Sequence, residues 1–170
     1  MKINSFETDI QPEDLAVINK PDTFRDRMTN DDTLISKELP IVIKYDYIDL
    51  GITDYHFKQF FQLRDTQEYF GMMKVMSSNT INALEEKSRR ERGFHFYRSG
   101  LNGNVRRAIK KLLPDADDDL IVYHFGLYEC DSRQASRETG ERSPRIYFLL
   151  GSNGFVYILF FDPFHELNPV

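Results

Sequence analysis

The chain has 170 residues, of which 41% are hydrophobic, and its formal net charge is −5 at pH 7. This length and composition predict one soluble globular domain, and no apolar run approaches the roughly 20 residues that cross a bilayer. The single cysteine, Cys130, excludes an internal disulfide, and we expect no secretory signal, so we predict a cytoplasmic protein with no membrane partner.

The first 39 residues differ from the rest of the chain. Residues 1–39 are acidic, and their apolar side chains are scattered without a sustained helical or strand period. We therefore predict an acidic N-terminal arm over residues 1–39 and a folded domain over residues 40–170. The arm could lie over the domain or reach toward a partner.

The domain is expected to begin with a strand and to continue with helices. β-Branched and aromatic residues dominate residues 41–50, which predicts a strand. Apolar residues at helical spacing predict helices over 54–61, 66–76 and 81–90. In the helix over 66–76, Phe70 is expected to face the core.

A short aromatic strand is expected over residues 94–98, followed by a loop and a basic helix over 105–113. Side chains alternate between the two faces of a strand. This alternation places His95 and Tyr97 on one face of the short strand and Arg98 on the other.

The C-terminal stretch from Arg145 to His165 predicts a β-hairpin. Two apolar runs flank Gly-Ser-Asn-Gly, a sequence typical of a tight turn between antiparallel strands. The second run, residues 155–161, carries no polar side chain, so it needs cover on both faces and an interior place in a sheet. Pro163 cannot continue the ladder, which puts His165 just beyond the strand end.

A further strand over residues 120–129 precedes this hairpin and completes a three-strand antiparallel run. The order of elements therefore predicts an α+β fold in a single domain. Its sheet should be mainly antiparallel, with helices packed on one face.

Basic residues cluster in the middle of this acidic chain. Nine Lys or Arg residues and a single acidic residue lie between Lys87 and Lys111. Such a cluster can attract phosphate even on a protein of negative net charge, although a solvated helix face is the ordinary alternative. The sequence contains no Walker loop, dinucleotide-binding glycine motif or zinc-protease motif.

Basic, aromatic and histidine side chains together suit the cleavage of RNA without a metal. That reaction needs a base for the ribose 2′-OH, cations for the charged transition state and an acid for the leaving oxygen. The candidate catalytic residues are His165, His95, Arg145 and Arg98. The candidate nucleic-acid-binding residues are Tyr97, Arg106, Arg107, Lys110, Lys111 and Tyr147. The alternative is that both tyrosines are core aromatics and His165 caps the terminal loop.

Three histidines, His95, His124 and His165, lie in or beside predicted strands, and Asp162 precedes the last of them. Imidazole and carboxylate ligands suit zinc or iron, which leaves a metal hydrolase as a third alternative. The spacing matches no known ligand pattern, and we predict no metal and no cofactor.

The segment from Arg145 through Gly-Ser-Asn-Gly to His165 resembles the closing hairpin of the RelE/ParE/HigB-type bacterial toxins. The shared pattern is an Arg-initiated strand, a tight turn, an apolar strand and a terminal His or Tyr. The segment is also similar to small uncharacterised bacterial proteins that end in D-P-x-H. The toxin resemblance implies a compact α+β fold and RNA cleavage without metal, often at the ribosome, under control of an antitoxin. Arg145 and His165 match the pattern, and Tyr147 fits it less closely.

Two functions from different classes follow. The first is a toxin-like, metal-independent endoribonuclease acting on RNA, with an antitoxin-like protein partner. The second is a non-catalytic protein-interaction module, such as a regulator or a phage-defence accessory, that binds a protein partner through its acidic arm and aromatic surface. The sequence leaves the oligomeric state open.

Overall fold

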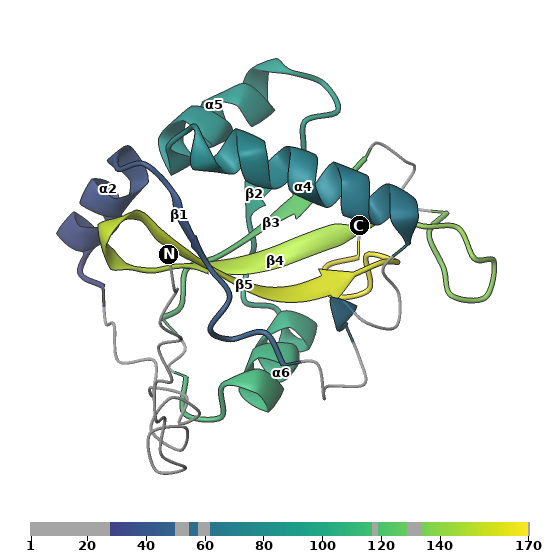
Figure 1. Cartoon of the computed structure of the whole chain (residues 1–170). Helices are drawn as coiled ribbons and strands as arrows, with labels where there is room; N and C mark the ends of the chain where they lie inside the picture. The colour runs from purple at the N-terminus through teal and green to yellow at the C-terminus, as the bar shows by residue number, and fades with distance from the viewer. Residues whose placement is uncertain (1–27, 50–54, 58–61, 117–118, 129–133, 170) are drawn as a thin grey trace, which may run out of the picture.

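A mixed five-stranded sheet with helices on both faces forms the centre of the molecule (Figure 1). The computed structural model describes residues 28–49, 55–57, 62–116, 119–128 and 134–169. The strands are β1 (Val42–Lys44), β2 (Phe96–Arg98), β3 (Val122–Gly126), β4 (Arg145–Leu150) and β5 (Phe155–Asp162). The helices in these residues are α2 (Asn30–Glu38), α4 (Leu63–Ser77), α5 (Ile81–Arg90) and α6 (Gly103–Leu112), with a 3-10 turn, η1 (Ser152–Gly154).

The strand order is β1-β5-β4-β3-β2. Three of the four pairings are antiparallel, and only β1 runs parallel to β5. The predicted α+β fold with a mainly antiparallel sheet is therefore confirmed. The predicted hairpin is β4 and β5, and β5 lies in the interior of the sheet, as its apolar sequence requires. Asn153 and Gly154 in the turn have φ of 55° and 75°, the left-handed backbone that an Asn-Gly hairpin turn uses.

One face of the sheet is covered by α4 and α5. Tyr69, Met73 and Met76 are the buried apolar side chains of α4, spaced so that they share one side of the helix. They join a core with strand residues such as Phe148. The expectation that Phe70 faces this core is wrong, because 63% of its side chain is exposed. It follows Tyr69 directly, and consecutive helical residues point about 100° apart.

The opposite face is partly covered by α6. The sequence alone predicts all the helices on one face of the sheet. Val105 and Ile109 of α6 pack with Tyr147, Leu149 and Phe160 of the sheet in a second buried cluster. Figure 1 shows α6 on the other side of the sheet from α4 and α5. The centre of the sheet, β3, β4 and most of β5, is therefore buried on both faces, which explains the unbroken apolar run in β5.

The observed elements differ in extent from the sequence expectations. The strand expected over 41–50 is paired only over Val42–Lys44. Part of the predicted arm forms α2, whose N-terminus is closed by a capping box between Thr29 and Asp32, and which contacts α5 and η1. The rest of the arm, residues 1–27, and most of the helix expected over 54–61 lie outside the described residues. No described helix has both the length and the apolar character that a membrane span needs.

The turn between β4 and β5 gives a test of the fold. At Gly154, φ is 75°, and an added Cβ would lie 2.6 Å from the carbonyl oxygen of Pro40. We expect Gly154→Ala to lower the free energy of unfolding by about 1–3 kcal/mol, because a left-handed alanine and a clash with main chain are both unfavourable. Urea denaturation measures this change.

Gly71→Ala is the matched control. Gly71 lies inside α4, and an added Cβ meets nothing within 4 Å. Alanine has the higher helix propensity, so this variant should be up to about 1 kcal/mol more stable than the parent. Equal destabilisation by the two alanines would contradict the described turn.

Candidate functional site

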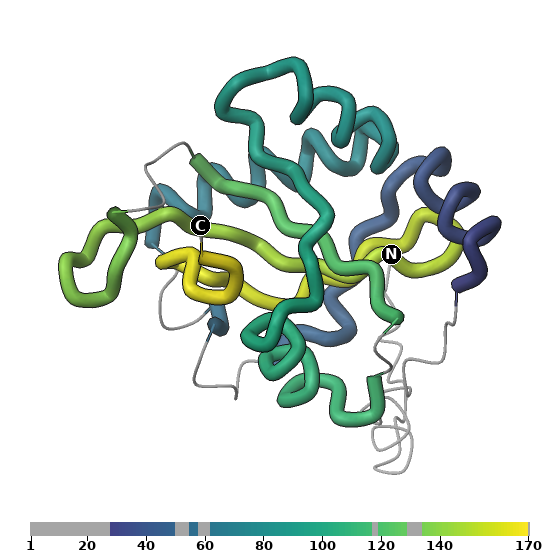
Figure 2. The backbone as a smooth tube through the Cα atoms, turned by 180° about the vertical axis from the view of Figure 1, so that it is seen from behind, coloured from purple at the N-terminus to yellow at the C-terminus, as the bar shows by residue number. Residues whose placement is uncertain are grey.

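A pocket of about 360 Å³ opens on the α6 side of the sheet, beyond the part that the helix covers. Its lining residues are His95, Tyr97, Arg98, His124, Arg145, His165, Asn168 and Pro169. They come from β2 and the residue just before it, from β3 and β4, and from the loop that follows β5. The reverse view shows this C-terminal loop lying over the sheet on the same side as α6 (Figure 2).

The pairing of β2, β3 and β4 brings the residues at the floor of the pocket side by side. Tyr97 is paired with His124 across β2 and β3, and Gly126 is paired with Arg145 across β3 and β4. Residues two apart on a strand share a face, so His124 and Gly126 lie on the same side. A Cβ added at Gly126 would lie 3.0 Å from Nη1 of Arg145 and 3.1 Å from Cβ of His95. The missing side chain of Gly126 therefore makes room for the guanidinium group.

Arg145 is the buried cation of the pocket, with only 4% of its surface exposed. Its Nη1 donates hydrogen bonds to the carbonyl oxygens of Ser143 at 3.3 Å and Pro144 at 3.1 Å. Its positive charge also helps to lower the pKa of both His124 and His165. The pocket thus carries a fixed positive charge beside two histidine rings.

His124 is held in one orientation by Ser99. The Ser99 hydroxyl and Nδ1 of His124 are hydrogen-bonded at 2.5 Å, and both side chains are buried. Burial, followed by the charges of Arg145, His165 and His95, lowers the pKa of His124 to about 3. The ring is therefore neutral at pH 7.

His165 is presented to the pocket by a tight turn after β5. The buried carboxylate of Asp162 accepts hydrogen bonds from the backbone N–H groups of Phe164 at 3.2 Å and Leu167 at 2.8 Å. This Asx-type turn leaves His165 with a left-handed φ of 60°, a region that histidine enters more often than most residues. The ring centroid of His165 lies 6.1 Å from that of His124.

The ring nitrogens of His165 are its most informative feature. Both are buried, and neither has a hydrogen-bond partner among the described residues. Leaving a buried polar atom without a partner costs about 1–3 kcal/mol, so a polar ligand in the pocket would bind to these atoms favourably. Burial, followed by the charges of Arg145 and His95, lowers the pKa of His165 to about 4. Its neutral ring can accept a proton at pH 7.

Five of the ten candidate site residues meet in this pocket. They include all four candidate catalytic residues, His165, His95, Arg145 and Arg98, together with Tyr97. Arg98 lines only the edge of the pocket, because it is paired across β2 and β3 with Tyr123, whose side chain belongs to the core on the opposite face. Tyr97 lies at the outside of the pocket lining, and 44% of its surface is exposed.

The other candidates lie elsewhere. Tyr147 is fully buried, its ring centroid is 5.3 Å from that of His124, and burial raises the pKa of its hydroxyl. It therefore supports the pocket floor and does not offer a ring for stacking. Arg107 and Lys111 line a second cavity, whereas Arg106 lines neither pocket. The Lys110 ammonium donates to the carbonyl oxygen of Ala116.

His124 is the site residue that the catalytic prediction left out. The signal was present, since it is the one histidine in the apolar strand predicted over 120–129 and lies in the middle of that strand. Such a residue in a buried strand needs a partner or a function. Among the described residues, no three His, Cys, Asp or Glu side chains are arranged to hold a metal ion.

Comparison with known proteins finds no matching family model, no matching curated protein and no matching solved structure. The similarity of the C-terminal hairpin to RelE/ParE/HigB-type toxins therefore stays a prediction. What can be said about function rests on the geometry of the pocket.

The pKa of His165 predicts how stability depends on pH. An unfolded histidine titrates near pH 6.5, whereas His165 in the folded chain titrates at about 4. Between these values the unfolded chain binds the proton and the folded chain does not, so the free energy of unfolding falls as the pH falls. We expect His165→Asn, which tolerates a left-handed backbone, to reduce this decline by up to about 1 kcal/mol per pH unit.

Urea denaturation of both proteins at pH 7 and pH 5 measures the effect. The raised pKa of buried Asp162 acts in the opposite direction, because the folded chain binds that proton first. Asp162 is present in both proteins, so the comparison largely cancels its contribution. Parallel stability curves for the two proteins would show that His165 does not titrate as described.

Proposed function

We propose that this chain is a metal-independent endoribonuclease and that the pocket around His165 and Arg145 is its active site. The observation that supports this most strongly is the meeting of a neutral, unpartnered imidazole and a buried guanidinium in the lining of one pocket. A proton acceptor beside a fixed cation is the minimum that attack by a ribose hydroxyl on its neighbouring phosphate requires.

In the proposed reaction, His165 accepts the proton of the ribose 2′-OH. The 2′-oxygen forms a bond to phosphorus, the bond from phosphorus to the 5′-oxygen breaks, and the products carry a 2′,3′-cyclic phosphate and a 5′-hydroxyl. Protonated His95, which is half-buried at the rim, donates the proton that the leaving 5′-oxygen takes up. Arg145 binds the non-bridging oxygens, where negative charge grows in the transition state.

The low pKa of His165 fits this role once RNA is bound. In the absence of a ligand, burial and the charge of Arg145 make the ring a weak base. A phosphate group bound to Arg145 would offset that positive charge and raise the pKa of the histidine toward neutrality. His124, fixed by Ser99, is a positioning residue that packs beside His165.

The exposed Tyr97 at the mouth of the pocket favours single-stranded RNA as the substrate. The exposed ring of Tyr97 has its centroid 6.1 Å from those of His95 and His124, so it lies at the pocket mouth. An unpaired base can stack on such a ring, whereas a base inside a duplex cannot reach it.

A protein-interaction module remains the second candidate, supported by exposed apolar side chains away from the pocket. Four large apolar side chains are between 57% and 77% exposed: Leu34 and Ile35 on α2, and Leu63 and Phe70 on α4. Apolar side chains of this size on a surface are common in protein-binding faces. A stoichiometric complex with a protein partner, without RNA cleavage by either the free or the bound chain, would favour this function.

RNA cleavage by the purified chain in the presence of EDTA tests the proposal. We expect cleavage of a single-stranded RNA to a 2′,3′-cyclic phosphate and no cleavage of the same oligomer with 2′-deoxyribose. His165→Asn and Arg145→Lys should each reduce kcat/KM by about 100-fold or more, because one removes the proton acceptor and the other the forked donor.

Phe70→Ser is the matched control, since this exposed side chain on α4 belongs to the other face of the molecule. Its activity should equal that of the parent chain. Cleavage that persists in the double variant of His165 and Arg145 would refute this active site.

Gly126→Ala gives a gentler test of the same site. Its methyl group would approach Nη1 of Arg145 at 3.0 Å and press on His95, so the guanidinium must shift by a few tenths of an ångström. Because such a shift displaces a transition-state donor, we expect kcat to fall about tenfold or more while the chain stays folded. Steady-state kinetics with the cyclic product as readout measures this, and unchanged kcat would place the guanidinium outside the reaction.

A further inference from the structure

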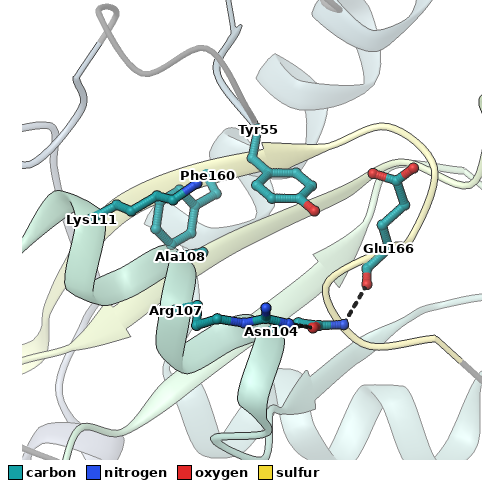
Figure 3. Close-up of a pocket in the computed structure, with 7 residues that line it drawn as sticks. All are labelled: Tyr55, Asn104, Arg107, Ala108, Lys111, Phe160 and Glu166. Atoms are coloured by element: carbon teal, nitrogen blue, oxygen red, sulfur yellow. Dashed lines mark hydrogen bonds between the residues drawn. The ribbon is translucent and has the colours of Figure 1, made fainter.

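A second cavity, of about 420 Å³, lies between α6 and β5 on the same side of the sheet (Figure 3). Residues that line it include Tyr55, Asn104, Arg107, Lys111, Phe160 and Glu166. Figure 3 shows Asn104, Arg107 and Lys111 entering from α6, Phe160 from β5 and Glu166 from the C-terminal loop. We propose that this cavity binds a nucleotide of the RNA next to the one that is cleaved, an inference that rests on the proposed ribonuclease function.

Two cations on one side of α6 supply the binding site for phosphate. Arg107 and Lys111 are four residues apart, so they lie one above the other on the helix. The Arg107 guanidinium is held in place, because Nε donates to the carbonyl oxygen of Gly103 at 3.1 Å and Nη2 donates to Oδ1 of Asn104 at 2.6 Å. A fixed guanidinium loses little entropy when it binds an anion.

Aromatic and polar groups in the same cavity suit a nucleobase. The half-buried ring of Tyr55 offers apolar surface for a flat ligand, and the buried ring of Phe160 lies at the base of the cavity. The Tyr55 carbonyl oxygen accepts a hydrogen bond from the backbone N–H of Phe161 at 2.9 Å, which fixes the tyrosine against β5. The Glu166 carboxylate, which accepts from Nε of Arg137 at 2.8 Å, can also accept from the amino groups of a base. Phosphate-binding cations, a stacking surface and an edge acceptor together describe a nucleotide site.

The second cavity is a neighbour of the first pocket. His165 lines one and the next residue, Glu166, lines the other, so the C-terminal loop is a wall that both share. Asn102 and Asn104 at the start of α6 tie this loop down through Nδ2 donors to the carbonyl oxygens of Leu167 at 3.1 Å and Glu166 at 3.2 Å. Tyr55 also helps to raise the pKa of Tyr147, whose ring contacts His124 under the first pocket.

Nucleotide binding by the full chain tests the inference without requiring cleavage. The probes are the four nucleoside 5′-monophosphates, inorganic phosphate and a tetranucleotide with 2′-O-methyl groups, each titrated against the ¹⁵N-labelled chain. We expect the amide signals of Asn104, Arg107 and Glu166 to shift with at least one mononucleotide. Arg107→Ala with Lys111→Ala should weaken this binding about tenfold or more, as the loss of charge-assisted hydrogen bonds predicts.

Lys74→Ala is the control, because Lys74 is an exposed cation on α4, the helix that covers the opposite face of the sheet. It should leave mononucleotide affinity unchanged. With cleavable RNA, the double variant of Arg107 and Lys111 should raise KM about tenfold and change kcat by less than twofold, a pattern that loss of fold would not produce. The dispersed amide spectrum of each variant reports folding directly.

The outcomes separate this inference from the function on which it rests. RNA cleavage with unchanged KM in the double variant would overturn the second site and leave the ribonuclease proposal intact. Mononucleotide binding at the cavity without any RNA cleavage would support the site and overturn the ribonuclease proposal. Inorganic phosphate that binds as tightly as every mononucleotide would overturn the nucleobase part, because the aromatic and carboxylate groups would then contribute nothing.

Discussion

The guanidinium of Arg145 is buried in the sheet, where a positive charge is costly to hold without polar partners. The backbone carbonyl oxygens of the segment before β4 accept its hydrogen bonds, and a glycine on β3 leaves it the necessary space. Burial lowers the pKa of His124 and His165, and the field of Arg145 acts in the same direction, so both rings are neutral at pH 7. The proposed anion binding and proton transfer both depend on this pairing of a buried cation with neutral imidazoles.

A bulge in the β4–β5 ladder decides which side chains surround that cation. Tyr147 is paired with Phe160, but the next residue, Phe148, is paired with Ile158, so Leu159 is an extra residue on β5. Regular pairing from Ile158 onward would have put Phe161 opposite Arg145. The extra residue instead places Asp162 opposite Arg145, at the start of the turn that carries His165. Because a one-residue slip exchanges the faces of a strand, the bulge is a condition for the pocket.

Local patterns in the sequence were enough for the hairpin and for two of the pocket residues. The Asn-Gly turn, the apolar run of β5 and Pro163 predict strand ends, and strand ends place Arg145 and His165. Features that depend on tertiary packing were beyond such patterns: the bulge, the covering of the second face by α6 and the hydrogen bond that fixes His124. The burial of Tyr147 belongs to the same class, since a β4 tyrosine faces either water or α6 according to where that helix packs.

The C-terminal loop connects these features, because a single buried carboxylate organises it. Asp162 accepts backbone hydrogen bonds from residues two and five positions later, which closes the chain into a turn against the start of α6. The turn directs His165 to one side and Glu166 to the other. Both side chains are therefore fixed by the same backbone, and the hydrogen bonds from Asn102 and Asn104 hold that backbone against α6. The spacing of the two cavities is thus set by one short turn, whose geometry depends on the carboxylate of Asp162.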